Sequence, residues 1–247
     1  MTPRLDPQIP TEVITVKIFE NAGPIGGVAF AILLLFGFAV LEPLREATDQ
    51  ELISWWSEKG NQRDTAISMY FFLACVPCFL VFLGSLRSKL LAGEGGSGAG
   101  SALVFSLGIC FAAAVLIASL SRGLIGHSVQ FGNESLPGAD VLRYITSFSV
   151  VLIGLVAVPA FALMIAVASW IAIRTGALAA WLGWLGLVVA TLSMILVVLL
   201  EGPIASPLLQ IWVVAASIEL FRTRNRLPEG VPATITAPSG QASRAAV

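Results

Sequence analysis

Long apolar runs alternate with short polar connections along this chain, and the runs have the length of membrane-spanning helices. A helix needs about 20 predominantly apolar residues to cross the hydrocarbon core of a bilayer. The six runs that approach this length are 24–41, 65–86, 101–120, a run opening near Tyr144, 178–200 and 204–221. The pattern predicts an all-α integral membrane bundle of six transmembrane helices.

The strongest packing signal follows the turn Arg174-Thr175-Gly176, which joins two apolar runs into a helical hairpin. Small residues then recur every three or four positions, at Ala179, Gly183, Gly186, Ala190 and Ser193. Such spacing places them on one face of a helix, where small side chains let a second backbone approach closely in lipid. We expect this face to be a packing seam around which the bundle is organised, with Leu187 facing lipid.

A short amphipathic helix is predicted at 48–59, between the first two runs. Thr48 and Glu51 have the spacing of a capping box, and Gly60 supplies a stop. Leu52, Trp55 and Trp56 share one face. Tryptophan suits the headgroup level of a membrane, so we expect the helix to lie on the outer membrane surface.

Pro159 stands in the middle of the fourth run and predicts a kink there. After Arg122 the chain turns polar as far as Asp140, which predicts a loop on the outer side. The predicted division is an N-terminal tail over 1–22, a six-helix transmembrane domain over 23–221 and a disordered tail over 222–247. No cleavable signal peptide is recognisable before the first run.

Composition agrees with a membrane protein. Hydrophobic residues make up 57% of the 247 residues and charged residues 12%, about half of the ~25% typical of soluble domains. The net charge of −1 gives no basic face for nucleic acid. The bilayer is the main expected partner and another membrane protein a second, while the oligomeric state stays open.

Basic residues predict the orientation, because they are enriched on the cytoplasmic side of membranes. Nine lie on the side of the termini: Arg4, Lys17, Arg87, Lys89, Arg174, Arg222, Arg224, Arg226 and Arg244. Five lie on the other side: Arg45, Lys59, Arg63, Arg122 and Arg143. Both termini should therefore be cytoplasmic. Trp170, Trp181 and Trp184 then fall together at the cytoplasmic interface.

Two stretches carry a resemblance to known sequences: IRTGALAAWLGWLGLVVATLSMILVVLLEGP with LLQIWVVAASIELFRTR, and TDQELISWWSEKGNQRDTAISMYFFLACVPCFLVFLGSLRSKL. They resemble a group of multi-pass membrane proteins of unassigned role that is common in actinobacteria. This group often has a proline and a basic residue before the Trp-Leu-Gly-Trp run, where this chain has Ala179 and Ala180. The resemblance implies six helices and a bacterial plasma membrane, and it carries no catalytic residues.

Cys75 and Cys78 form the sharpest chemical pattern, because two cysteines separated by two residues can act as a redox pair. Membrane thiol oxidoreductases that work with quinones use such pairs. A reactive thiolate needs a helix N-terminus or a nearby cation, however, and Cys75 sits in mid-run among apolar residues. Packing beside Pro77 is the competing interpretation. All three cysteines lie in apolar runs, so no disulfide framework is indicated.

A second candidate is an outer polar pocket formed by Glu42, Arg122, His127 and Glu201. Ionisable groups at the ends of spans can bind cations or relay protons, although a glutamate there is more often a solvated stop. The sequence contains no phosphate-binding loop, Ser-His-acid arrangement or His-Glu metal motif, so it assigns no catalytic residue, metal or cofactor. Three functions stay open: a structural or accessory membrane protein, a small transporter or ion-binding protein using the outer acids, and a thiol or quinone oxidoreductase.

Overall fold

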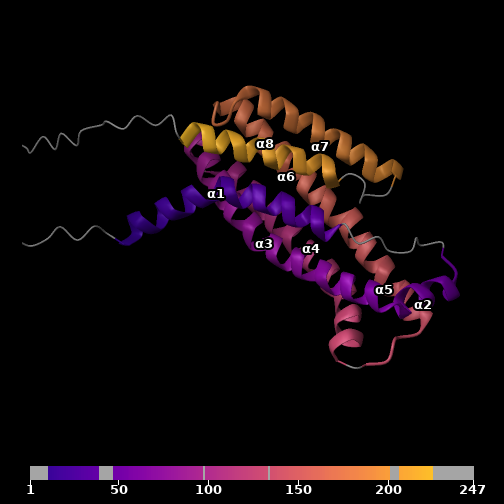
Figure 1. Cartoon of the computed structure of the whole chain (residues 1–247). Helices are drawn as coiled ribbons and strands as arrows, with labels where there is room; N and C mark the ends of the chain where they lie inside the picture. Colours follow the sequence, from indigo (N-terminus) through magenta and orange to yellow (C-terminus); the bar gives the residue numbers. More distant parts are fainter. Residues whose placement is uncertain (1–10, 39–46, 97, 133, 201–205, 225–247) are drawn as a thin grey trace, which may run out of the picture.

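A computed structural model describes residues 11–38, 47–96, 98–132, 134–200 and 206–224. Their regular structure is entirely helical: α1 Thr11–Gly37, α2 Asp49–Ser57, α3 Lys59–Glu94, α4 Ala99–Phe131, α5 Ala139–Leu152, the π-helical turn η1 Ile153–Ala157, α6 Val158–Thr175, α7 Ala180–Leu200 and α8 Ser206–Arg224. In Figure 1 the Thr11 end of α1 and the Arg224 end of α8 lie at the same end of the molecule, opposite α2. Helix α1 begins inside the stretch expected to be a tail.

Four of the described helices are long and apolar enough to cross a membrane. They are Lys59–Glu94, Ala99–Phe131, Ala139–Thr175 and Ala180–Leu199, and α1 contains a shorter apolar segment, Ala22–Gly37. Their length and composition are compatible with a membrane protein. With 36 and 33 residues, α3 and α4 measure about 54 and 50 Å, well beyond the ~30 Å hydrocarbon core.

The bundle packs around α3, which contacts α1, α4 and α6. Helices α3 and α4 are antiparallel, as a Cβ added at Gly108 would meet Leu83 and one added at Gly126 would meet the Gln62 carbonyl. Helix α1 approaches α3 so closely that a Cβ at Gly26 would stand 2.7 Å from the Cys78 carbonyl oxygen. The expectation that the 178–200 helix organises the bundle is therefore wrong, because α7 contacts α6 and α8 at the periphery.

Four phenylalanines fill the centre between α1, α3, α4 and α6. Phe30, Phe79, Phe111 and Phe161 are at most 4% exposed, and all six pairs of ring centroids lie between 4.3 and 6.1 Å apart. These separations are those of favourable aromatic pairs. In lipid, where helix association depends on close packing, this cluster joins four helices at once.

The expected seam on α7 is confirmed for four of its five residues, whereas Ala179 precedes the helix and is half-buried. Gly183, Gly186, Ala190 and Ser193 are buried, and added Cβ atoms at the two glycines would meet Ile173 and Ser169 of α6. The hairpin turn is also as expected, since Gly176 ends α6 with a φ of 69° and its N–H donates to the Ala172 carbonyl. Leu187 is half-buried, so it does not face lipid freely.

Helical irregularity occurs beside Pro159, as expected, in the form of the π-helical turn η1. Proline has no N–H to donate and crowds the preceding turn. The chain accommodates this with one wider turn, in which the Val158 N–H donates to the Ile153 carbonyl.

Two predicted boundaries are wrong. Helix α4 continues through the stretch predicted to be a loop as far as Phe131, because Gly123 and Gly126 pack tightly against Met69 and Gln62 of α3. At the other end, α3 begins at Lys59 and contains Gly60, so this glycine stops no helix.

Candidate functional site

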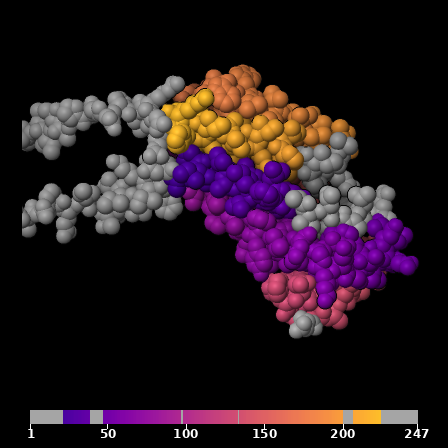
Figure 2. Space-filling model, in the orientation of Figure 1, coloured from indigo at the N-terminus to yellow at the C-terminus, as the bar shows by residue number. Residues whose placement is uncertain are grey.

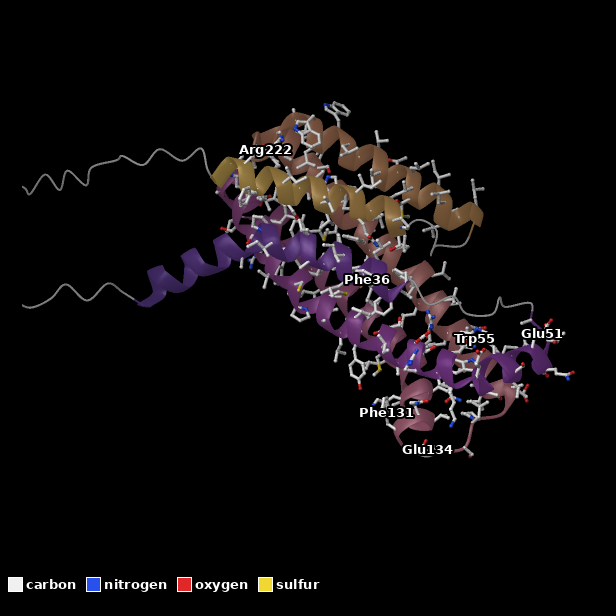
Figure 3. The ribbon with its side chains drawn as sticks, in the orientation of Figure 1. Phe36, Glu51, Trp55, Phe131, Glu134 and Arg222 are labelled. Carbon is white, nitrogen blue, oxygen red and sulfur yellow. The ribbon has the colours of Figure 1, made fainter. Side chains whose placement is uncertain are left out.

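Helices α3, α4 and α5 extend to the end of the molecule that contains α2, and the two polar candidates within the described residues, Arg122 and His127, both lie on α4. Figure 3 shows Glu51, Trp55, Phe131 and Glu134 at this end and Arg222 at the opposite end. Leu52, Trp56, Ile125 and Leu142 form a second apolar cluster there, separate from the main core. The extension is therefore a packed unit rather than a polar loop.

Helix α2 begins as predicted. The Thr48 hydroxyl accepts from the Glu51 N–H at 3.3 Å, and the Glu51 carboxylate accepts from the Thr48 N–H at 2.8 Å. The Thr48 hydroxyl also donates to this carboxylate, at 2.9 Å. The bonds donated to the carboxylate by the Thr48 N–H and then by the Thr48 hydroxyl hold the pKa of Glu51 below its ordinary value. The cap is best formed when Glu51 is ionised.

The predicted position of the tryptophans is only partly correct. Trp55 is half-buried, but Trp56 is 1% exposed because it packs against the side chains of the second cluster. The amides of Asn61 and Gln62 donate to the Trp55 and Trp56 carbonyls at 2.8 and 2.7 Å. These bonds close the end of α2 and turn the chain into α3.

Arg143 connects α5 to the start of α2. Its Nη2 lies 2.7 Å from both the Asp49 carboxylate and the Ala47 carbonyl. Because both charged side chains are more than one-third exposed, the ion pair alone contributes at most about 1 kcal/mol. Its main effect is to orient α2 against α5.

Arg122 lies half-buried on α4 and lines a small niche in the bundle wall. The other lining residues are Thr65, Ser68, Met69, Phe72, Val115, Ser119, Gly123 and Ile153. The niche volume is about 10 Å³, which is room for about one water molecule. The hydroxyl groups of Thr65, Ser68 and Ser119 donate to backbone carbonyls, which leaves their lone pairs free to accept from a guanidinium or a water. We name this set the Arg122 niche.

His127 is not brought to the Arg122 niche. Five residues along a helix correspond to a rotation of about 140°, so His127 points to another face of α4. Its ring centroid lies 6.4 Å from that of Tyr70 and 5.2 Å from that of Phe131. Glu42 and Glu201, the two acids of the expected pocket, lie outside the described residues. The four-residue pocket thus stays a prediction.

The hydroxyl lining is the part of the niche that sequence reasoning missed. Thr65 and Ser68 are three residues apart on one helix, and Ser119 precedes Arg122 by three on another. Such spacing puts each pair on one face, so the signal was present. The contribution of Ile153 to the lining of the niche could not be recognised from the sequence, because it depends on the packing of η1 against α4.

The cysteine pair sits in the core. Cys75 is completely buried and its thiol lies 3.2 Å from the Phe72 carbonyl oxygen, while Cys78 is half-buried. All three cysteines, including the exposed Cys110, are free thiols. Among the described residues, no group of three His, Cys, Asp or Glu side chains could hold a metal ion.

Comparisons of the chain with protein-family models, curated proteins and solved structures give no match.

Proposed function

We propose that the protein is a six-span plasma-membrane protein with both termini in the cytoplasm and a structural or accessory role. The observation that carries this proposal is the aromatic centre of the bundle, where four buried rings from α1, α3, α4 and α6 are in mutual contact. A transport path would need a hydrated route between such helices. A core filled with phenylalanine instead supports a rigid body that presents surfaces to other molecules.

Six spans are supported by the packing of the two shorter helices. A Cβ at Gly23 would meet Ser85 of α3 and one at Gly37 would meet Phe72, so α1 runs beside the apolar part of α3. Helix α8 runs beside α1, where Gly27 faces Ser217, and Trp212 of α8 packs on α7. Because α1 and α8 pack alongside helices that are long and apolar enough to cross a membrane, we infer that they cross it as well.

The orientation is supported by the basic residues of the sequence and by three exposed tryptophans. Trp170, Trp181 and Trp184 are 52%, 52% and 62% exposed around the Gly176 turn. The Arg174 guanidinium stands 4.3 Å from the Trp170 ring centroid, an arrangement suited to a headgroup interface. The resemblance to actinobacterial proteins supports a bacterial plasma membrane as the location.

Topology is tested by cysteine labelling in a chain whose three native cysteines are changed to Ala. Six spans predict that Glu58→Cys and Glu134→Cys react with an impermeant maleimide from outside intact cells. Ala177→Cys and Asn225→Cys should react only after permeabilisation. Labelling of positions 58 and 225 from the same side would contradict six spans.

The accessory role is tested by complementation of a strain that lacks the gene. A chain carrying Arg122→Gln, Cys75→Ala and Cys78→Ala should restore any phenotype as well as the wild type, because a structural role needs none of this chemistry. Membrane abundance of the variant is the control. Loss of function at normal abundance would contradict the proposal.

A second candidate function is ion binding or transport by outer-side acids such as Glu42 and Glu201 together with Arg122. The observation that favours it is the position of η1, since Ile153 of this π-helical turn lines the Arg122 niche. Such turns are frequent at functional sites. In the complementation experiment this candidate predicts that Arg122→Gln alone abolishes function, while Cys75→Ala with Cys78→Ala does not.

A further inference from the structure

An apolar groove of about 420 Å³ runs along the outside of the bundle between α1 and α8. Its lining residues are Pro24, Ile25, Val28, Ala29 and Ile32 from α1 and Ser217, Ile218 and Phe221 from α8. In Figure 2, α1 lies directly along α8 on the visible face of the molecule. The volume falls within the range of small-molecule sites in proteins.

The shape of the groove follows from the sizes of its side chains. Gly27 of α1 faces Ser217 of α8, and these small residues bring the two backbones close together. Larger side chains rise on both sides and stay uncovered: Ile25 is 67% exposed, Ile32 50% and Phe221 48%. Small residues at its base and large ones at its edges make a narrow apolar furrow.

Charge distinguishes one end of this groove. Pro24 and Ile32 are eight residues apart, so the groove extends about 12 Å along α1. At its other wall Phe221 is followed directly by the exposed Arg222, which Figure 3 places at the end of α8. Arg224 and Arg226 follow in the sequence. Arg222 therefore provides one positive charge beside the Phe221 end of the apolar groove.

We propose that this groove binds one acyl chain of an anionic phospholipid, whose phosphate group is held near Arg222. Basic sites between transmembrane helices bind anionic headgroups, and each basic side chain near the surface contributes about 1 kcal/mol. A purely apolar helix from a partner protein could fill the groove but would offer no negative group to pair with Arg222. The inference requires that the chain spans a membrane, and it is independent of the accessory role.

Native mass spectrometry of the full chain, purified in detergent and supplied with phosphatidylglycerol or phosphatidylcholine, tests the proposal. We expect one phosphatidylglycerol to be retained, with an affinity about fivefold above phosphatidylcholine. Ala29→Phe, which fills the groove, should abolish retention. The matched control is Ala102→Phe on the exposed surface of α4. If Ala29→Phe does not fold, Ile218→Trp fills the groove from its opposite wall.

Arg222→Gln should remove the preference for phosphatidylglycerol while a bound lipid chain remains. Arg87→Gln, an exposed arginine at the same end of the molecule, should leave the preference unchanged. Equal lipid retention in folded Ala29→Phe would overturn the proposal. A wild-type dimer that becomes a monomer in Ala29→Phe would also overturn it, because a second copy would then cover the groove.

Discussion

Gly186 is the position where one added side chain tests the packing of three helices. A Cβ at this position would overlap Ser169 Oγ of α6 and the Trp212 indole nitrogen of α8, and would stand 2.9 Å from Trp212 Cδ1. Trp212 is completely buried and its indole N–H donates to the Leu182 carbonyl at 3.2 Å. The indole therefore cannot move without losing a hydrogen bond.

The cost of Gly186→Leu can be worked from these contacts. Overpacking a closed interface costs about 1 to 3 kcal/mol. Loss of the Trp212 hydrogen bond adds about 0.5 to 1.5 kcal/mol. Leucine has a higher helix propensity than glycine, which offsets roughly 0.8 kcal/mol of this loss. We therefore expect a net loss of about 1 to 4 kcal/mol in the free energy of unfolding.

Unfolding by sodium dodecyl sulfate in mixed micelles, followed by circular dichroism, measures this loss. The matched control is Val188→Leu, two residues further along α7, where the side chain is 63% exposed and the change should cost less than about 0.5 kcal/mol. Equal unfolding curves for the two variants would refute the reasoning and place the seam toward lipid.

A double-mutant cycle separates the two overlaps at Gly186. The Ser169 hydroxyl has no hydrogen-bond partner among the described residues, so Ser169→Ala alone should be nearly neutral. In the Gly186→Ala background it should recover part of the lost stability. If Ser169→Ala recovers no stability in that background, the whole cost of the added Cβ comes from displacement of Trp212.

Two further predictions concern α1 and α2. Gly26→Ala should lower the free energy of unfolding by about 1 to 3 kcal/mol in the same assay, because the Cys78 carbonyl oxygen, 2.7 Å from the added Cβ, belongs to the backbone and cannot rotate away. The control Gly84→Ala adds a Cβ that meets nothing within 4 Å, so it should be neutral or stabilising. Equal losses in the two variants would contradict the close approach of α1 and α3. Because the pKa of Glu51 is lowered in the folded protein, its carboxylate stabilises the α2 cap fully above its ordinary pKa, and this stabilisation is lost as pH falls through the lowered value. The hydrogen-exchange protection of α2 should therefore decrease with acid, and it should decrease less in Thr48→Val. Protection that is independent of pH would contradict a cap that depends on ionised Glu51.

Local features of this protein were readable from its sequence. The capping box at Thr48, the hairpin turn at Gly176 and the small-residue face through Gly186 depend on residues within four positions of one another. Their geometry is set by the backbone of one or two helices. The all-helical fold follows from the length of the apolar runs in the same way.

The tertiary structure alone decided which helix is central, which tryptophan is buried and which polar residues meet. Helices α3 and α7 are both strongly apolar, yet α3 lies at the centre and α7 at the edge. Trp56 packs against Ile125 and Leu142, whose sequence positions carry no sign of that contact. The physical reason is that lipid and protein interior are equally apolar, so hydrophobicity does not distinguish the face of a helix that meets another helix from the face that meets lipid. That choice depends on the fit of side chains from distant segments, and so does the groove between α1 and α8.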